Sequence, residues 1–267
     1  MTNKKVSIIS SIYYPDERCF KRFLDACIAQ TLDDIEFIFI FDGPEDTKSR
    51  DLLKQYKNKF SDIIVIENSE NMGVKESFKK GLYIASGKYI FNPDHDDFFD
   101  NDLIKEAYNY IEEINEECIR FNVITGYVNN SVFDEMYCDT QTLFYKKSFG
   151  IQNLDFIYIT DYNQEDGANF KKFEKYKPLP FELGCFYYHV KNDSSTTYAI
   201  EMGLGKEKNI LNEMEFYDLM KRSFLYNYKN CNINYNMTIK EMKEHLMYIE
   251  NKGVFNNNFT YEDLSRI

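Results

Sequence analysis

The chain has 267 residues, of which 43% are hydrophobic and 28% are charged, a balance typical of a globular protein with a sizeable core. Its formal net charge of −12 argues against nucleic acid and anionic membrane surfaces as general partners. The six cysteines show no CxxC pair and no repeated spacing, which argues against a zinc site or a disulfide framework and predicts reduced thiols in a cytoplasmic protein.

Short apolar runs alternate with amphipathic segments over the first 115 residues. The runs are rich in β-branched or aromatic residues and predict buried strands at 6–11, 35–41, 63–66 and 89–92. After each run, apolar side chains recur at the three- and four-residue spacing of a helix. Four strand–helix alternations are typical of a parallel sheet with right-handed crossovers, so the sequence predicts an α/β fold.

Polar residues follow three of the predicted strands at the point where each ends. Ser11 ends the first strand and Tyr13 lies just past it, Asp42 follows the second, and residues 94–97 follow the fourth. Ligands of parallel sheets bind at the carboxyl ends of the strands. The three groups are therefore expected to form one binding site at a single edge of the sheet.

The segment after the fourth strand carries three carboxylates in four residues, Asp94, Asp96 and Asp97. Like charges this close repel one another, and a shared cation relieves the repulsion. A hard divalent ion that also carries a diphosphate suits such oxygen ligands. The alternative interpretation is that Asp96, Asp97 and Asp100 only cap and charge the helix expected from about residue 101.

The rest of the chain is less regular. Strands are expected at 118–127, 142–145 and 185–190, and a helix near Gln164. Beyond about residue 200 the helical spacing returns, at 210–226 and 239–249.

Six short motifs follow one another in order between residues 6 and 97. They are Val6-Ser7-Ile8-Ile9-Ser10-Ser11-Ile12-Tyr13, Ala29-Gln30-Thr31-Leu32-Asp33-Asp34-Ile35-Glu36, Phe41-Asp42-Gly43, Asn71-Met72-Gly73, Ala85-Ser86-Gly87-Lys88-Tyr89-Ile90 and Asp94-His95-Asp96-Asp97. Their order and spacing resemble those of the inverting glycosyltransferases of family 2. The resemblance implies a GT-A fold at 1–200, with a donor-binding half at 1–115, an acceptor and catalytic half at 116–200, and a helical C-terminal region at 201–267.

The resemblance also implies a nucleotide-sugar donor, with a UDP-sugar as the expected one. Tyr13 would stack on the base with help from Ser11, and Asp42 would accept a hydrogen bond from uracil. The alternative for Asp42 is a turn-former ahead of Gly43 and Pro44. The chain departs from the Asp-Asp-Gly-Ser of the family at the first and last of these positions, where Phe41 and Pro44 stand.

Asn71 and Gly73 match the Asn-x-Gly of the family, where the backbone approaches the donor. Lys75 is a candidate for contact with phosphate or base, although a solvated helix lysine is an equal interpretation. Lys79 stands where the family usually has Asn.

Asp94 and Asp96 match the metal motif of the family, which implies Mn²⁺ or Mg²⁺ as the cofactor. Asp94 would reach the ribose or a metal-bound water, and Asp96 would bind the ion that stabilises the departing diphosphate. His95 lies between them in the donor site. Because successive side chains on extended backbone point to opposite faces, His95 is expected to support the site rather than bind the ion.

Inverting transfer needs a base that deprotonates the acceptor hydroxyl. The family takes it from a Glu-Asp pair at a helix start, which Glu165 and Asp166 match, with Asp166 as the base. The alternatives are an acidic first turn that favours the helix dipole, and Asp161 as a competing base. The segment 188–195 resembles the Tyr-Arg-x-His-x-x-Ser of the family, with His189 in place of Arg.

Lys191 stands in place of the His of that segment. A lysine can hold a diphosphate as a point charge but is a poor metal ligand at neutral pH, so Lys191 is expected to neutralise phosphate in place of the ring, with plain solvation as the equal alternative.

The sequence thus predicts a metal-dependent, non-processive inverting glycosyltransferase with a glycan or lipid-linked acceptor, in the synthesis of a surface polysaccharide or glycoconjugate. Processive members carry Gln-x-x-Arg-Trp and membrane helices, whereas this chain has no Trp and no apolar stretch near the length of a membrane span. The N-terminus lacks the apolar region of a signal peptide.

The location expected from these features is the cytoplasm, with the C-terminal region available for docking at the inner membrane face or for oligomerisation. The alternative function is a sugar-nucleotide-binding protein of the same fold with impaired catalysis.

Overall fold

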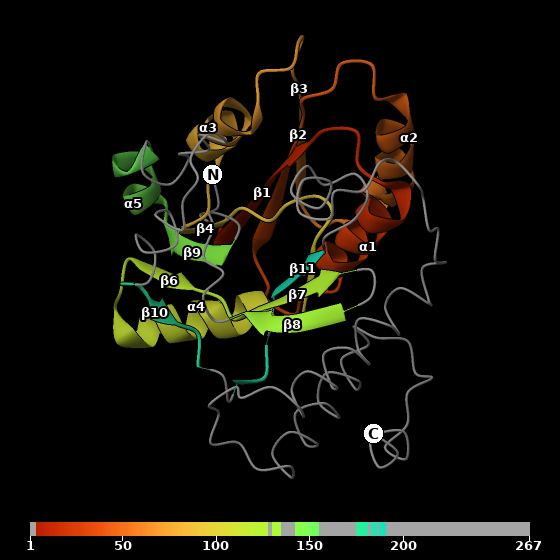
Figure 1. Cartoon of the computed structure of the whole chain (residues 1–267). Coiled ribbons are helices and arrows are strands. Elements are labelled where there is room, and N and C mark those ends of the chain that lie inside the picture. Colours follow the sequence, from red (N-terminus) through yellow and green to blue (C-terminus); the bar gives the residue numbers. More distant parts are fainter. Residues whose placement is uncertain are drawn as a thin grey trace, which may run out of the picture.

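The computed structural model describes residues 4–127, 130–134, 142–154, 175–180, 183–185 and 187–190. The helices are α1 (Glu17–Ile28), α2 (Thr47–Tyr56), the 3₁₀ turn η1 (Lys57–Lys59), α3 (Val74–Ile84), α4 (Leu103–Ile114) and α5 (Lys147–Gln152). The strands are β1 (Val6–Ile12), β2 (Ile35–Phe41), β3 (Ile63–Glu67), β4 (Tyr89–Phe91), β5 (Phe98–Phe99), β6 (Cys118–Arg120), β7 (Val123–Tyr127), β8 (Asn130–Asp134), β9 (Leu143–Lys146), β10 (Lys177–Pro178) and β11 (Tyr187–Val190). Figure 1 shows their arrangement.

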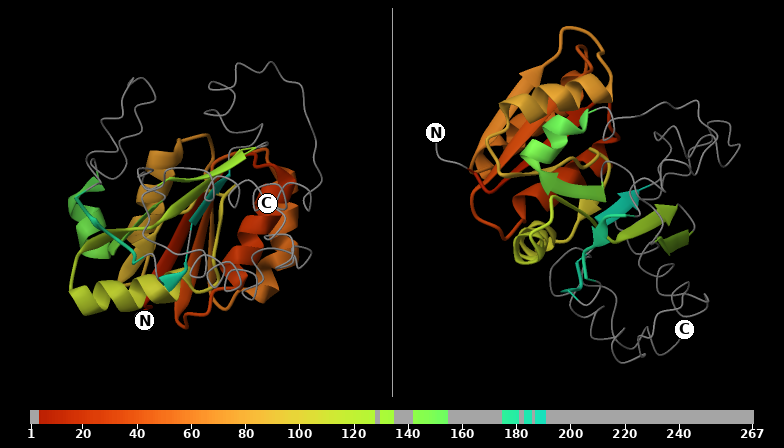
Figure 2. Two further views of the ribbon diagram at one scale, coloured as in Figure 1. Left: turned by 60° about the horizontal axis from the view of Figure 1, so that its bottom comes forward. Right: turned by 90° about the vertical axis from the view of Figure 1, so that its left-hand side faces the viewer.

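The strands of the described chain form two sheets. The larger has the order β10-β6-β9-β4-β1-β2-β3, and the smaller has the order β5-β11-β7-β8. Strands β4, β1, β2 and β3 pair in parallel, whereas β9 is antiparallel to both β4 and β6. In the right-hand view of Figure 2, strands β7, β8 and β11 of the smaller sheet lie to one side of the parallel strands. The parallel half confirms the α/β fold predicted from the alternation of strands and helices.

Helices cover both faces of the larger sheet. Helices α1, α2 and α4 bury apolar side chains in one cluster with Ile8, and helices α3 and α5 do so in a second cluster with Ile9. Successive residues of β1 thus point to opposite faces. Both faces are buried, which explains why every residue of β1 and β2 is buried and why neither strand alternates strictly between apolar and polar residues.

The carboxyl ends of β1 and β2 are level with each other. Ile12, the last residue of β1, pairs with Phe41, the last residue of β2, and the amide of Asp42 donates to the carbonyl oxygen of Ile12 at 2.9 Å. Residues that follow these strands therefore begin at the same edge of the sheet.

The single strand expected at 118–127 is wrong. The structure divides it into β6 in the larger sheet and β7 in the smaller one. The division falls at Asn122, whose side chain donates to the carbonyl oxygen of Leu179 at 2.7 Å and whose own carbonyl accepts from Tyr187 at 3.0 Å. These two hydrogen bonds lie at the point where the chain leaves the larger sheet and enters the smaller one. The sequence did not predict β5, β8, β10 and α5 either, and β5 and β10 have only two residues each, too few for a periodic pattern.

Gln30, from the second of the six motifs, joins the end of α1 to the start of α4. Its amide nitrogen donates to the carbonyl oxygens of Ala26 at 3.1 Å and Asp100 at 3.0 Å, and its oxygen accepts from the amide of Ile104 at 3.3 Å. One side chain thus satisfies backbone groups at two helix ends, which leaves fewer unpaired groups there.

Glu36 is a buried carboxylate under the turn that precedes β4, with 3% of its surface exposed. Its Oε1 accepts hydrogen bonds from the Ser7 hydroxyl, from the Ser86 amide and, at 3.1 Å, from the Gly87 amide. A Cβ on Gly87 would overlap the backbone nitrogen of Ser7 and lie 2.6 Å from the carbonyl carbon of Val6. This close approach explains the glycine of the Ala-Ser-Gly motif.

The atoms that a Cβ on Gly87 would meet include backbone atoms of β1, an interior strand of the larger sheet. We therefore expect Gly87→Ala to lower the free energy of unfolding by about 1–3 kcal/mol, the usual cost of overpacking. Urea unfolding measures the change. Ser86→Ala is the matched control, because it keeps the amide that binds Glu36, and it should stay within about 0.5 kcal/mol. Equal stability of the Gly87→Ala and unsubstituted proteins would contradict the prediction.

No described helix is long and apolar enough to cross a membrane. The helix expected near Gln164 and the helical region expected beyond residue 200 lie outside the described residues.

Candidate functional site

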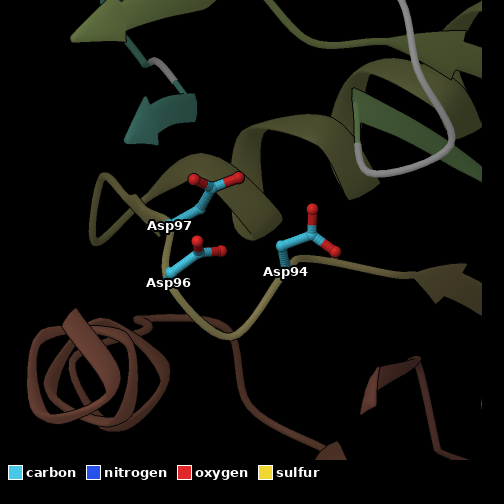
Figure 3. Close-up of side chains that lie close together, drawn as sticks. All are labelled: Asp94, Asp96 and Asp97. Atoms are coloured by element: carbon cyan, nitrogen blue, oxygen red, sulfur yellow. The ribbon is translucent and has the colours of Figure 1, made fainter. Parts of the chain in front are cut away.

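Three carboxylates meet in the loop after β4. Oxygen atoms of Asp94, Asp96 and Asp97 all lie within 4.8 Å of one another. Figure 3 shows the loop as a U with the three side chains on its open side. Asp94 and Asp96 are partly exposed, whereas Asp97 is fully buried. A compact set of oxygen donors fits a hard cation such as Mn²⁺ or Mg²⁺ better than a thiophilic metal.

Strand β11 holds the buried member of this cluster. The hydroxyl of Tyr187 donates to Oδ2 of Asp97, and Nδ1 of His189 lies 3.1 Å from the same oxygen. The Tyr187 oxygen also accepts from the amide of Asp94 at 3.4 Å. Tyr187 and His189 are two residues apart on a strand and therefore point to the same face. Their contacts connect the acidic loop to the smaller sheet.

The imidazole of His189 is a positive partner for the acidic loop. Burial acts to lower the pKa of His189, but the charge of Asp97, its hydrogen bond and the charges of Asp96 and Asp94 outweigh burial and raise the pKa to about 9. At neutral pH the ring is charged, so the chain itself supplies part of the neutralisation that three clustered carboxylates require.

The alternative interpretation of these acids as caps of α4 finds little support in the contacts. The residue that precedes the helix is Asp102, and its side chain makes no capping hydrogen bond. Asp97 faces β11, and Asp100 accepts from the hydroxyl of Tyr188 at 3.4 Å. The side-chain hydrogen bonds of Asp97 with Tyr187 and His189, and of Asp100 with Tyr188, thus lead to the smaller sheet.

Two tyrosines stand exposed at the end of β1. Tyr13 and Tyr14 are each 47% exposed, and their rings meet edge to face with centroids 4.9 Å apart. Tyr14 has a φ of 41° and its amide donates to Asp46 at 3.2 Å. A Cβ on Gly43 would lie 2.7 Å from the Tyr14 ring, so the glycine allows this ring to rest on the turn. The edge therefore offers aromatic surface beside Asp42, and Tyr14 was not predicted.

Asp42 is only 2% exposed and binds the start of α3. Its Oδ1 accepts from the side-chain nitrogen of Asn68 at 2.7 Å and from the Met72 amide at 2.8 Å, and its Oδ2 accepts from the Gly73 amide at 2.8 Å. The Gly73 amide also donates to Oδ1 of Asn71 at 2.9 Å. Gly73 has a φ of 82°, which favours glycine. The structure thus brings Asn71 and Gly73 next to Asp42.

His95 connects the acidic loop to β1. Its Nδ1 lies 2.8 Å from the carbonyl oxygen of Ser11. A carbonyl oxygen can only accept, so Nδ1 carries the proton and donates it. Ser11 itself is 7% exposed. This contact brings together two of the three polar groups that were expected at one edge of the sheet.

The remaining candidate residues fall partly within the described residues and partly outside them. Lys75 lies partly buried in the first turn of α3. Lys79 forms an ion pair with Glu76 at 2.8 Å on the same helix. Asp166, its competitor Asp161 and Lys191 lie outside the described residues, so their proposed roles rest on the sequence.

Comparison with known families and sequences gives a consistent result. The model of the family described as Glycosyl transferase family 2 matches residues 7–176, more than half of the chain. An uncharacterized glycosyltransferase of Methanocaldococcus jannaschii is 32% identical over 112 residues, which are 42% of this chain and 39% of that protein. The poly(ribitol-phosphate) beta-glucosyltransferase of Bacillus spizizenii is 30% identical over 139 residues, 51% of this chain and 22% of that protein. The chain therefore matches less than half the length of either relative.

The architecture is also similar to that of solved structures. S. aureus TarS 1–349 in complex with UDP-GlcNAc superposes with a TM-score of 0.58 and 16% identity, over 93% of this chain and 72% of that one. The same protein in complex with UDP gives a TM-score of 0.53 and 15% identity, over 90% of this chain and 77% of that one. At this identity the likeness establishes a shared fold, the mostly parallel sheet with helices on both faces.

Proposed function

Because this chain belongs to glycosyl transferase family 2, we propose that it is a metal-dependent inverting glycosyltransferase that moves a sugar from a UDP-sugar to an acceptor glycan or lipid-linked sugar. The observation that carries the proposal is that the acidic loop contacts β1 at Ser11, two residues before the exposed Tyr13, and that Asp42 follows β2 at the same edge of the sheet. Aromatic surface, a buried hydrogen-bond acceptor and clustered oxygen ligands are the chemical groups that a nucleoside diphosphate needs.

Two comparisons support the finer parts of the proposal. TarS, whose fold is similar, was crystallised with UDP-GlcNAc and with UDP, which supports a uridine nucleotide as the donor carrier. A poly(ribitol-phosphate) beta-glucosyltransferase and a minor teichoic acid biosynthesis protein are among the relatives. The activities that these relatives are named for support an acceptor that belongs to a cell-surface polymer, with synthesis of surface polysaccharide as the process.

In this proposal the chain binds the two ends of the donor with different elements. Tyr13 stacks on the base, with Ser11 beside it, and Asp42 accepts a hydrogen bond from the uracil N–H. Asn71 and Gly73 form the backbone wall next to Asp42.

The phosphates lie toward α3 and the acidic loop. Lys75 at the start of α3 and Lys191 contribute positive charge near the diphosphate. His95 holds the acidic loop against β1 through the carbonyl of Ser11.

Asp94 and Asp96 are the residues that would hold Mn²⁺ or Mg²⁺. They are the partly exposed members of the acidic cluster, whereas the buried Asp97 is engaged by β11. A hard divalent cation bound there would supply charge stabilisation to the departing diphosphate. His189 stabilises the loop from the side of Asp97.

The transfer itself needs one base. Asp166 takes the proton of the acceptor hydroxyl as that oxygen attacks the anomeric carbon of the donor sugar. The bond between the anomeric carbon and the phosphate oxygen breaks, and its electron pair leaves with the nucleoside diphosphate. Attack opposite the leaving group inverts the anomeric configuration. A nearby carboxylate also stabilises the positive charge that develops on the sugar ring.

A panel of nucleotide sugars tests the proposal directly. We expect UDP-sugars together with Mn²⁺ to raise the melting temperature of the full chain more than GDP-, CDP- or ADP-sugars do, because a ligand that binds only the folded state stabilises it. Release of UDP from the stabilising donor then separates a transferase from a catalytically impaired sugar-nucleotide-binding protein. A protein whose melting temperature responds to no nucleotide sugar, with or without Mn²⁺, contradicts the proposed function.

A further inference from the structure

The hydrogen bonds to Asp42 are unevenly divided between its two oxygens. Among the described contacts, Oδ1 accepts from Asn68 and from the Met72 amide, whereas Oδ2 accepts from the Gly73 amide. An ionised carboxylate offers about two lone pairs on each oxygen. The chain therefore fills Oδ1 and leaves one position on Oδ2 for a further donor.

Asn68 is the only side chain in these contacts, and it is itself held at several points. It follows β3, is 3% exposed, and its amide donates to the carbonyl oxygen of Phe41 at 2.9 Å. Its side-chain nitrogen donates to Asp42 at 2.7 Å and to the Ser77 hydroxyl oxygen at 2.9 Å. Its side-chain oxygen accepts from the ammonium group of Lys80 at 2.7 Å.

These partners fix which way the Asn68 amide faces. The Lys80 ammonium can only donate, so it must meet the amide oxygen. The Asp42 carboxylate can only accept, so it must meet the amide nitrogen. The two contacts agree with each other, and a flipped amide would lose both. The side-chain amide of Asn68 therefore has one orientation, in which its nitrogen donates to Oδ1 of Asp42.

We propose that Asn68 is a positioning residue for recognition of the donor base, because it occupies Oδ1 of Asp42 and so directs the open position on Oδ2 toward the ring N–H of uracil. The inference rests on the proposed function, in which Asp42 contacts the base. Uracil carries a proton on N3, whereas N3 of cytosine carries none and can only accept. Asn68 therefore contributes to the choice between the two pyrimidine nucleotides without touching either of them.

Two substitutions at Asn68 keep the size of the side chain and remove the donor. Asn68→Leu replaces the amide by an apolar group, and Asn68→Asp places an acceptor against Asp42 where the donor was. Ser77→Ala is the matched control, because Ser77 is buried in the same network and binds Asn68 without contacting Asp42 in the described structure. Circular dichroism and melting temperature establish that each protein is folded.

The readout is the affinity of the full chain for UDP and for CDP, measured by calorimetry with Mn²⁺ in excess. We expect each Asn68 substitution to weaken UDP binding about tenfold, which is the effect of losing the charge-assisted hydrogen bond between Asp42 and the ring N–H of uracil. CDP binding should change much less, because cytosine has no such N–H. The ratio of UDP to CDP affinity then falls, whereas Ser77→Ala leaves that ratio unchanged.

The outcomes separate this inference from the proposed function. If either folded Asn68 protein binds UDP and CDP as tightly as the unsubstituted chain does, Asn68 does not position Asp42, and the proposed function stands. If both nucleotides weaken equally, Asn68 has only a structural role and the inference is overturned. If the unsubstituted chain binds no UDP, the proposed function fails and the inference fails with it.

Discussion

The Asp96→Ala protein is expected to lose metal-dependent release of UDP from its donor by at least about a hundredfold. Asp96 is one of two partly exposed carboxylates in a cluster whose oxygens lie within 4.8 Å of one another. Its removal leaves Asp94 as the exposed ligand, because Asp97 is buried against β11. A single carboxylate binds a hard divalent ion weakly, since such ions need several oxygen ligands.

Two measurements check this expectation. The rate of UDP release is followed at increasing Mn²⁺, and the affinity for Mn²⁺ is measured separately by electron paramagnetic resonance of the free ion. Asp51→Ala is the control, because Asp51 is an exposed carboxylate on α2 that pairs with Lys54. If the Asp96→Ala protein keeps both its rate and its Mn²⁺ affinity, the assignment of the ion to the acidic loop is wrong.

Asp166→Asn is expected to lower the rate of sugar transfer at least about a hundredfold while the affinity for UDP stays unchanged. The amide keeps the size of the side chain but cannot take the proton of the acceptor hydroxyl. Because the proposed donor contacts come from residues 11–96 and Lys191, binding of UDP should not depend on this change. Single-turnover transfer and calorimetry measure the two quantities on the same protein.

Asp161→Asn provides the comparison, since Asp161 is the competing candidate for the base. We expect it to keep a rate within a few-fold of the unsubstituted protein. If Asp161→Asn loses the rate and Asp166→Asn keeps it, the two roles must be exchanged. If both proteins transfer at full rate, the base belongs to another part of the chain.

The parallel half of the fold could be predicted because each of its strands is an apolar run of its own. Burial on both faces makes β1 and β2 predominantly apolar without a strict alternation, and local sequence is enough to recognise them. The break between β6 and β7 could not be predicted in this way. It depends on the contact of Asn122 with Leu179, which is 57 positions away in the chain, and no pattern within residues 118–127 encodes that contact.

The candidate site likewise combines residues that the local sequence reveals with residues that it does not. Asp94, Asp96 and Asp97 are neighbours in the sequence, so their cluster was visible from the sequence alone. The tyrosine and histidine that hold Asp97 come from β11, more than 90 positions from the first of these acids. The signal was the two-residue spacing of Tyr187 and His189 within a predicted strand, but that spacing does not say what the strand faces.

The attachment of β11 to the acidic loop limits how such a protein can be recombined. A chimera that joins the first 115 residues of this chain to the second half of a relative would lose the hydroxyl and the imidazole that grip Asp97, unless the incoming strand supplies equivalents. A working graft should therefore exchange β4, its loop and β11 together. The acidic loop and β11 are far apart in the sequence but depend on each other in the structure. A crossover placed between them would separate Asp97 from the two side chains that bind it.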